Sequence, residues 1–128
     1  YFLLLLVWLL VLWSGLINNM ANTYKNAMFD LTATTKTSVY TCPANTTALI
    51  KTIQVTNIDS GNQELESFVT DSSNSDAEHE IAHVTIASKT VDNIAKGTIV
   101  LEAGDVLKLQ AATANKIAGI ISLVEIDF

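Results

Sequence analysis

Residues 117–126 have the sequence IAGIISLVEI, an apolar run with one charged side chain. Successive side chains of a β-strand point to opposite faces, so alternate residues of this run divide into two sets. Both sets are apolar, the first being Ala118, Ile120, Val124, Ile126 and Phe128 and the second Ile117, Gly119, Ile121 and Leu123. A strand that is apolar on both faces lies in the centre of a sheet or is covered on both sides. This stretch therefore predicts a central strand.

The run before it, residues 106–110 (VLKLQ), shows a different alternation. Leu107 and Leu109 would point inward, whereas Lys108 and Gln110 would point outward. A strand with one polar face lies with that face in solvent. The sequence AGD at residues 103–105 supplies the preceding turn.

The rest of the chain beyond residue 27 follows the same strand pattern. Thr occurs 15 times in the full sequence, interspersed with Val, Ile and Leu, and no helical period is sustained. The expected strands are residues 28–33, 37–42, 48–57, 64–70, 81–88, 90–94, 98–101, 106–111 and 117–126. Breaks every 8 to 12 residues or so are typical of an all-β sandwich or barrel. We therefore predict a single antiparallel β-sandwich of about eight or nine short strands, with a jelly-roll or immunoglobulin-like arrangement.

Several apolar residues on these strands are expected to form the core or the interfaces of the sandwich. They are Leu49, Ile53, Val55, Leu107, Leu109, Ile120 and Val124. The polar segments 59–62 and 71–76 should face solvent or a partner.

The charge balance excludes one class of function. Thirteen acidic residues face seven lysines, there is no arginine, and the net charge is −6. Nucleic-acid binding depends on clustered lysines and arginines that neutralise phosphates, so we expect no nucleic-acid partner. Cys42 is the only cysteine, so no internal disulfide can form, and we expect a buried structural thiol.

The first 19 residues differ in composition from everything that follows. Fifteen of them are apolar, and no charge precedes Lys25. Residues 1–17 are at the lower limit for a helix that spans a membrane, but the basic segment of a signal peptide is missing. The sequence MANT at residues 20–23 resembles a translation start. We expect a domain over residues 20–128, with translation starting at Met20, so that residues 1–19 would be an upstream extension that the native protein lacks. The alternatives are that residues 1–19 are a truncated signal peptide or a membrane anchor, and this segment would be helical if it is genuine.

Residues 79–83 (HEIAH) match the zinc-protease motif H-E-x-x-H. That chemistry needs a helix, because only on a helix do histidines four residues apart lie one turn apart on the same face, where both can bind a single ion. The β-branched run that follows His83 favours a strand, on which His79 and His83 would share a face about 13 Å apart at ~3.3 Å per residue. We therefore assign the two histidines to a surface or subunit contact and expect no metal, no cofactor and no catalytic residue.

Three stretches carry a resemblance to a known group of proteins. They are residues 20–27 (MANTYKNA), 40–57 (YTCPANTTALIKTIQVTN) and 101–112 (LEAGDVLKLQAA), with LVEI at 123–126 near the end. From Met20 onward the chain resembles small structural proteins of tailed bacteriophages, especially marine ones. The resemblance implies a virion component with a β-sandwich fold, present in symmetric copies on the capsid or tail, and it does not extend to residues 1–19.

We therefore expect a virion structural protein, either a capsid decoration or a tail or neck accessory component. It would act through contacts with its own copies and with other virion proteins, without a small-molecule substrate or catalysis. The alternative is a membrane-anchored or secreted bacterial β-sandwich for binding or adhesion, located in the cell envelope or outside the cell. In that case residues 1–19 would be genuine and a membrane would be a partner. The zinc hydrolase suggested by His79 and His83 is the remote third possibility.

Overall fold

The computed structural model describes residues 21–128, and the expected segment 1–19 lies outside them. The described residues form nine strands and one short 3-10 helix, which confirms the predicted all-β sandwich. The elements are β1 (Ala21–Asp30), β2 (Thr37–Thr41), β3 (Thr46–Asn57), β4 (Gln63–Asp71), η1 (Ser72–Asn74), β5 (Ala77–Ile86), β6 (Val91–Asn93), β7 (Ile99–Leu101), β8 (Val106–Ala111) and β9 (Ile117–Asp127). Among residues 21–128, no helix has the length and apolar character needed to cross a membrane.

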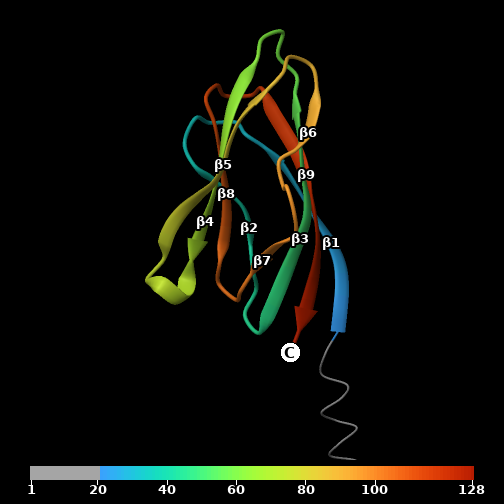
Figure 1. The fold of residues 1–128 in the computed structure, drawn as a ribbon, viewed down its shortest axis with the longest axis vertical. Helices are drawn as coiled ribbons and strands as arrows, with labels where there is room; N and C mark the ends of the chain where they lie inside the picture. The colour runs from blue at the N-terminus through green and yellow to red at the C-terminus, as the bar shows by residue number, and fades with distance from the viewer. Residues whose placement is uncertain (1–20) are drawn as a thin grey trace, which may run out of the picture.

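The strands form two antiparallel sheets that pack face to face (Figure 1). Sheet A has the order β1-β9-β3-β6, with β7 also paired to β3, and sheet B has the order β2-β8-β4-β5. Because β6 and β7 pair with successive parts of β3, together they act as one interrupted fourth strand. Two four-membered sheets in this order have the jelly-roll arrangement, which is one of the two that the sequence predicts.

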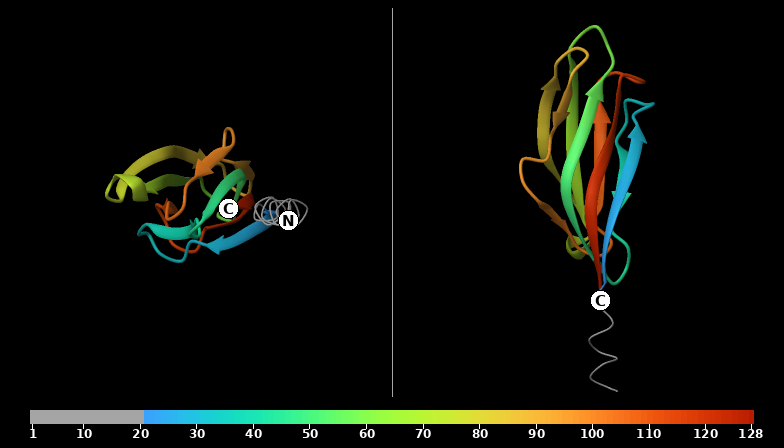
Figure 2. Two further views of the ribbon diagram at one scale, coloured as in Figure 1. Left: turned by 90° about the horizontal axis from the view of Figure 1, so that it is seen from below. Right: turned by 90° about the vertical axis from the view of Figure 1, so that its right-hand side faces the viewer.

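The strand β9 lies between β1 and β3, as its two apolar faces predict. Figure 2 shows the three strands side by side across one face of the sandwich. All ten residues of β1 and most of β3 pair with β9. Strand β8 also agrees with its pattern, since Leu107 and Leu109 are fully buried while Lys108 and Gln110 are not.

The first strand is the largest error in the predicted boundaries. We expected it over residues 28–33, but β1 spans Ala21–Asp30. Asn22, Lys25 and Asn26 have low strand propensity. Pairing with β9 over the full length of β1 holds these residues in an extended backbone, so tertiary contact overrides local preference.

The core lies between the two sheets, and four of the seven predicted core or interface residues belong to it: Ile53, Val55, Leu107 and Leu109. Leu49 and Ile120, which we also expected in the core, are only half-buried, and both lie on the outer face of sheet A. Val124 lies on that outer face as well, opposite Leu49, with 9% of its surface exposed. Leu49 and Ile120 therefore lie outside the core, whereas Val124 is buried even though it lies on the outer face. The reason is that β9 is apolar on both faces and only one of its faces meets sheet B.

Candidate functional site: an apolar sheet face

The outer face of sheet A carries a continuous row of apolar side chains. Tyr24 lies opposite Val124, Val124 opposite Leu49, and Leu49 opposite Val100, so the row crosses β1, β9, β3 and β7. We call the following set the apolar outer face: Tyr24, Met28, Leu49, Val91, Val100, Ile120, Val124 and Ile126. Within residues 21–128, seven large hydrophobic residues are exposed, and four of them are Tyr24, Met28, Val91 and Val100. Such clustering marks an interaction surface, since isolated exposed apolar residues are ordinary.

Two shallow hollows shape this face on either side of Ile120. One, of about 350 Å³, is lined by Tyr24, Lys51 and Val124 among others. The other, of about 500 Å³, is lined by Met28, Gln54 and Ala118 among others. Ile120 lines both hollows. The side chains of a partner can therefore fit into these hollows.

The outer face of sheet B has the opposite chemistry. Its side chains include Glu66 and Glu78, and Glu78 pairs with Lys36 and with Lys108 at 3.1 Å. Phe68 on this face is 7% exposed, and the Lys36 ammonium lies 4.0 Å from its ring centroid. Sheet B thus presents charge to solvent, whereas the apolar residues of sheet A are left uncovered.

A polar cluster around Glu125 joins β1 to β9 and joins β9 to β2 of the other sheet. Lys25 on β1 contacts Glu125 on β9 at 2.8 Å, and the Tyr40 hydroxyl on β2 donates a hydrogen bond of 2.8 Å to the same carboxylate. Burial alone would raise the pKa of Glu125, but the bonds from Lys25 and Tyr40 outweigh it and hold that pKa below its ordinary value. Burial and the neighbouring carboxylate raise the pKa of Tyr40. The cluster holds a strand that otherwise exposes most of its side chains.

The two histidines of the H-E-x-x-H motif lie on a strand, but our expectation that they share a face is wrong. Glu80 lies opposite Phe68 and Ala82 opposite Ser67, so Ile81 is an extra residue in β5. A bulge of this kind reverses the alternation, which turns His79 to the inward side and His83 to the outward side of sheet B. The two imidazoles are therefore on opposite faces.

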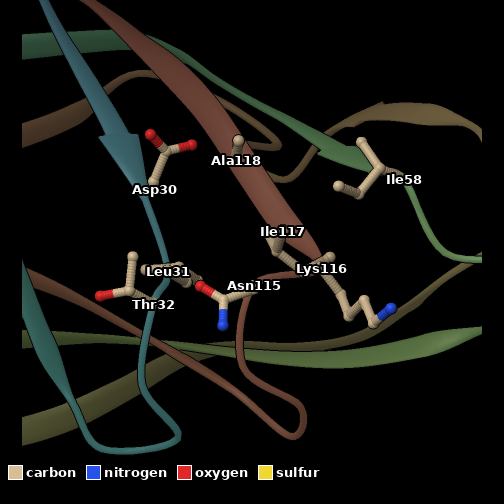
Figure 3. Close-up of a pocket in the computed structure, with 8 residues that line it drawn as sticks. All are labelled: Asp30, Leu31, Thr32, Ile58, Asn115, Lys116, Ile117 and Ala118. Atoms are coloured by element: carbon tan, nitrogen blue, oxygen red, sulfur yellow. The ribbon is translucent and has the colours of Figure 1, made fainter.

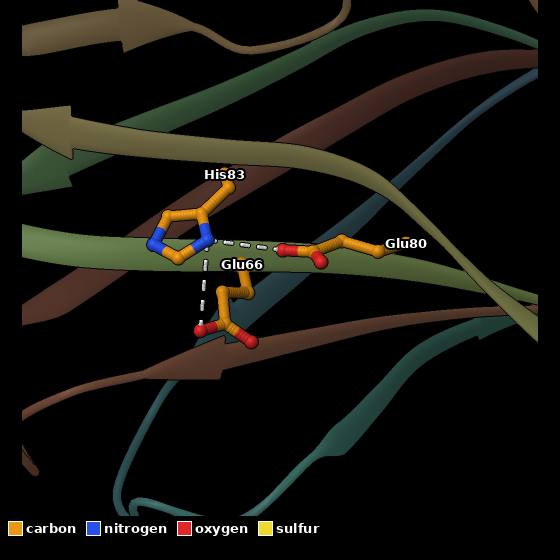
Figure 4. Close-up of side chains that lie close together, drawn as sticks. All are labelled: Glu66, Glu80 and His83. Atoms are coloured by element: carbon orange, nitrogen blue, oxygen red, sulfur yellow. Dashed lines mark ion pairs between the residues drawn. The ribbon is translucent and has the colours of Figure 1, made fainter.

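The same bulge brings Glu80 and His83 together (Figure 4). His83 Nδ1 lies 3.2 Å from a Glu80 carboxylate oxygen and 3.9 Å from a Glu66 oxygen. One imidazole and two carboxylates within 4.8 Å are suitable ligands for a divalent cation. His83 and Glu80 are exposed, and this cluster is also what an ordinary charged sheet surface provides.

A further pocket, of about 220 Å³, lies where β1 ends and β9 begins (Figure 3). Its two charged groups do not meet, because Lys116 extends away from Asp30 and pairs with Asp59 at 3.4 Å. Asn115 has a left-handed backbone, with φ of 62°, and its N–H donates to the Leu31 carbonyl. These groups serve the chain reversal before β9.

Cys42 is buried, as predicted, and burial raises the pKa of its thiol.

Sequence reasoning did not identify Tyr24 and Met28 as members of the functional face. The sequence does contain a signal for this face, because Tyr24 and Met28 are four residues apart and such residues lie on the same side of a strand. The predicted start of the strand at residue 28 hid this spacing.

Comparison with known proteins gives the fold and little more. No protein-family model matches this sequence, and no curated protein matches it. A protein from the disulfide-linked pili of Bacillus endospore appendages shares the fold with a TM-score of 0.52 and 10% identity, over 85% of this chain and 88% of that one. A protein from the acid-stable capsid of Helicobacter pylori bacteriophage KHP30 does so with a TM-score of 0.51 and 12% identity, over 83% of this chain and 87% of that one. At such identities, the likeness shows a common fold.

Proposed function

We propose that this protein is a structural component of a bacteriophage virion and works by binding, without catalytic turnover. The observation that carries the proposal is the contrast between its two outer faces. An apolar outer face on one sheet and a charged outer face on the other are suited to a subunit that is covered by a partner on one side and exposed to solvent on the other. The acidic net charge of −6 keeps free subunits soluble and apart until the apolar faces meet a partner.

Two further points support the virion setting. The sequence from Met20 onward resembles small structural proteins of tailed phages. The jelly roll is a recurrent fold of viral capsid proteins, and one solved protein with the same fold comes from a phage capsid. Within the virion, the proposed position is a capsid decoration or a tail or neck accessory, with other copies and neighbouring virion proteins as partners.

The test is the protein content of purified particles. Virions of the phage that encodes this chain are banded on a density gradient, and peptides from residues 21–128 are quantified against the major capsid protein. We expect a fixed number of copies per particle in repeated preparations, while a phage replication protein serves as the control for carry-over. Absence of the peptides from the particles, or their recovery in the host envelope fraction, would overturn the proposal.

A further inference from the structure

Within residues 21–128, strand β1 has a free edge, and its backbone pattern can be deduced from the structure. The Leu31 N–H donates to the Ile117 carbonyl at 2.9 Å, where Leu31 continues the β1–β9 register. Hydrogen-bonded and non-bonded pairs alternate along an antiparallel ladder, so the odd-numbered residues of β1 bond to β9. The even-numbered residues direct their N–H and C=O groups to the free edge; they are Asn22, Tyr24, Asn26, Met28 and Asp30.

The other edge strands of the described domain are all interrupted. In sheet B, β5 carries the bulge at Ile81, and β2 has a register shift between Ser38 and Tyr40. At the far edge of sheet A, β6 and β7 have three residues each. Bulges and short strands are the usual means by which proteins prevent edge-to-edge pairing. By contrast, β1 has ten residues in unbroken register, without proline or bulge.

We infer that β1 pairs antiparallel with β1 of a second copy, about a two-fold axis at Asn26. In this register Tyr24 lies opposite Met28 of the second copy, Asn22 lies opposite its Asp30, and Asn26 lies opposite itself. Each copy contributes the same residues, as a two-fold contact requires. The inference deepens the proposed function and rests on it, since it names a second copy of this chain as the partner.

Side-chain chemistry selects this register. The pairing places an aromatic ring against a methionine on the outer face and an amide against a carboxylate, and it brings no like charges together. A shift by two residues in one direction puts Tyr24 opposite Asn26 and Met28 opposite Asn22. A shift in the other direction puts Tyr24 opposite Asp30 and Met28 opposite Asn26. Tyr24 and Met28 are 86% and 75% exposed in the single chain, so the chosen register covers the two largest uncovered side chains of the strand.

The consequence is one continuous sheet shared by two copies. The apolar outer faces then lie side by side and form one larger surface, which a neighbouring virion protein can cover. The pairing also supplies partners for the free N–H and C=O groups of β1.

Site-specific cross-linking of the full chain tests the register. In Asn26→Cys, the two thiols lie across the axis and should form a disulfide-linked dimer under mild oxidation. Asn22→Cys is the matched control on the same edge, because its two thiols lie eight residues apart along the paired strands, which is roughly 26 Å at ~3.3 Å per residue. It should stay monomeric, whereas Asn22→Cys combined with Asp30→Cys should cross-link again. Cys42 is buried and unchanged in all three variants.

A backbone substitution provides a second measurement. Asn26→Pro removes an N–H that points to the free edge and leaves the ladder to β9 intact. We expect it to abolish the dimer in light scattering while the folded monomer persists by circular dichroism. Equal cross-linking of Asn22→Cys and Asn26→Cys, or an unchanged dimer in a folded Asn26→Pro variant, would overturn the inference. The particle analysis above is independent of either result, so failure of the pairing and failure of the virion role can be told apart.

Discussion

At the scale of single residues, Glu125 connects the parts of the molecule that sequence reasoning treated separately. It is 5% exposed and accepts from Lys25 on one strand and Tyr40 on another. A buried carboxylate is tolerated only when it is paired and hydrogen-bonded. We therefore expect Glu125→Gln to lower the free energy of unfolding at pH 7 by about 1.5–3 kcal/mol, the usual value of hydrogen bonds to a charged group.

The pH dependence of this difference has a definite sign. The pKa of Glu125 in the folded protein lies below its ordinary value of 4.5, so the carboxylate stabilises the fold above that pH and loses its contribution as the pH falls through the lower, folded value. Asp59 and Glu78 also have lowered pKa values, so wild type and variant alike lose stability in acid. Urea unfolding at pH 7 and pH 3 should show the gap between them closing. A gap of equal size at both pH values would contradict the assigned role of the Glu125 charge. Tyr40→Phe is the control, since it removes one hydrogen bond to the Glu125 carboxylate but keeps the charge of Glu125 and its ion pair with Lys25.

At the scale of elements, β9 depends on one glycine. A Cβ at Gly119 would collide with the Gln54 carbonyl oxygen of β3 and would lie 2.6 Å from Phe29 Cζ of β1. Both neighbouring strands approach too closely for any side chain. We expect Gly119→Ala to destabilise the fold by about 1–3 kcal/mol, the typical cost of overpacking.

Gly97→Ala is the matched control, because a Cβ at Gly97 has no atom within 4 Å. It should change stability by no more than about 0.5 kcal/mol. Thermal unfolding of both variants measures the contrast. Similar midpoints for the two would mean that β3 and β1 can move apart without cost.

The elements also show which features of the fold a sequence can reveal. Strands β8 and β9 follow clear alternation, so their existence, burial and central or solvent-facing position could be predicted. Strand β1 could not be placed correctly, because Asn22 and Asn26 adopt strand geometry only through pairing with β9. The bulge at Ile81 was hidden too, since nothing in the local pattern of β5 signals an extra residue, and it alone decides that His79 and His83 point to opposite faces.

The candidate site is harder to predict than the fold for a related reason. Leu49, Ile120 and Val124 have the composition of core residues, and composition does not distinguish an apolar face that meets the other sheet from one that faces outward. Only the register shows that they line up with Tyr24 and Val100. An apolar strand in the sequence can therefore mean either core or interface.

At the scale of the whole molecule, the two outer faces should respond differently to the same change. Val100 on the apolar outer face and Thr85 on the charged face of sheet B are both exposed strand residues. Val100→Lys and Thr85→Lys each add one positive charge, so their effects on net charge are equal. Val100 also lies on β7, away from the free edge of β1, so this substitution tests the face without disturbing the proposed strand pairing.

A lysine buried at an apolar contact loses hydration without gaining a partner, which opposes binding. We expect Val100→Lys to lower the number of copies per purified particle at least tenfold, equivalent to about 1.4 kcal/mol of binding free energy. Thr85→Lys should leave it unchanged, and both variants should unfold at the wild-type midpoint. Binding of wild type should also strengthen with added salt, because screening weakens repulsion between copies of net charge −6. Equal incorporation of the two variants would show that the outer face of sheet A is not the face that contacts the particle. The apolar row from Tyr24 to Val100 would then have to be covered by a different partner.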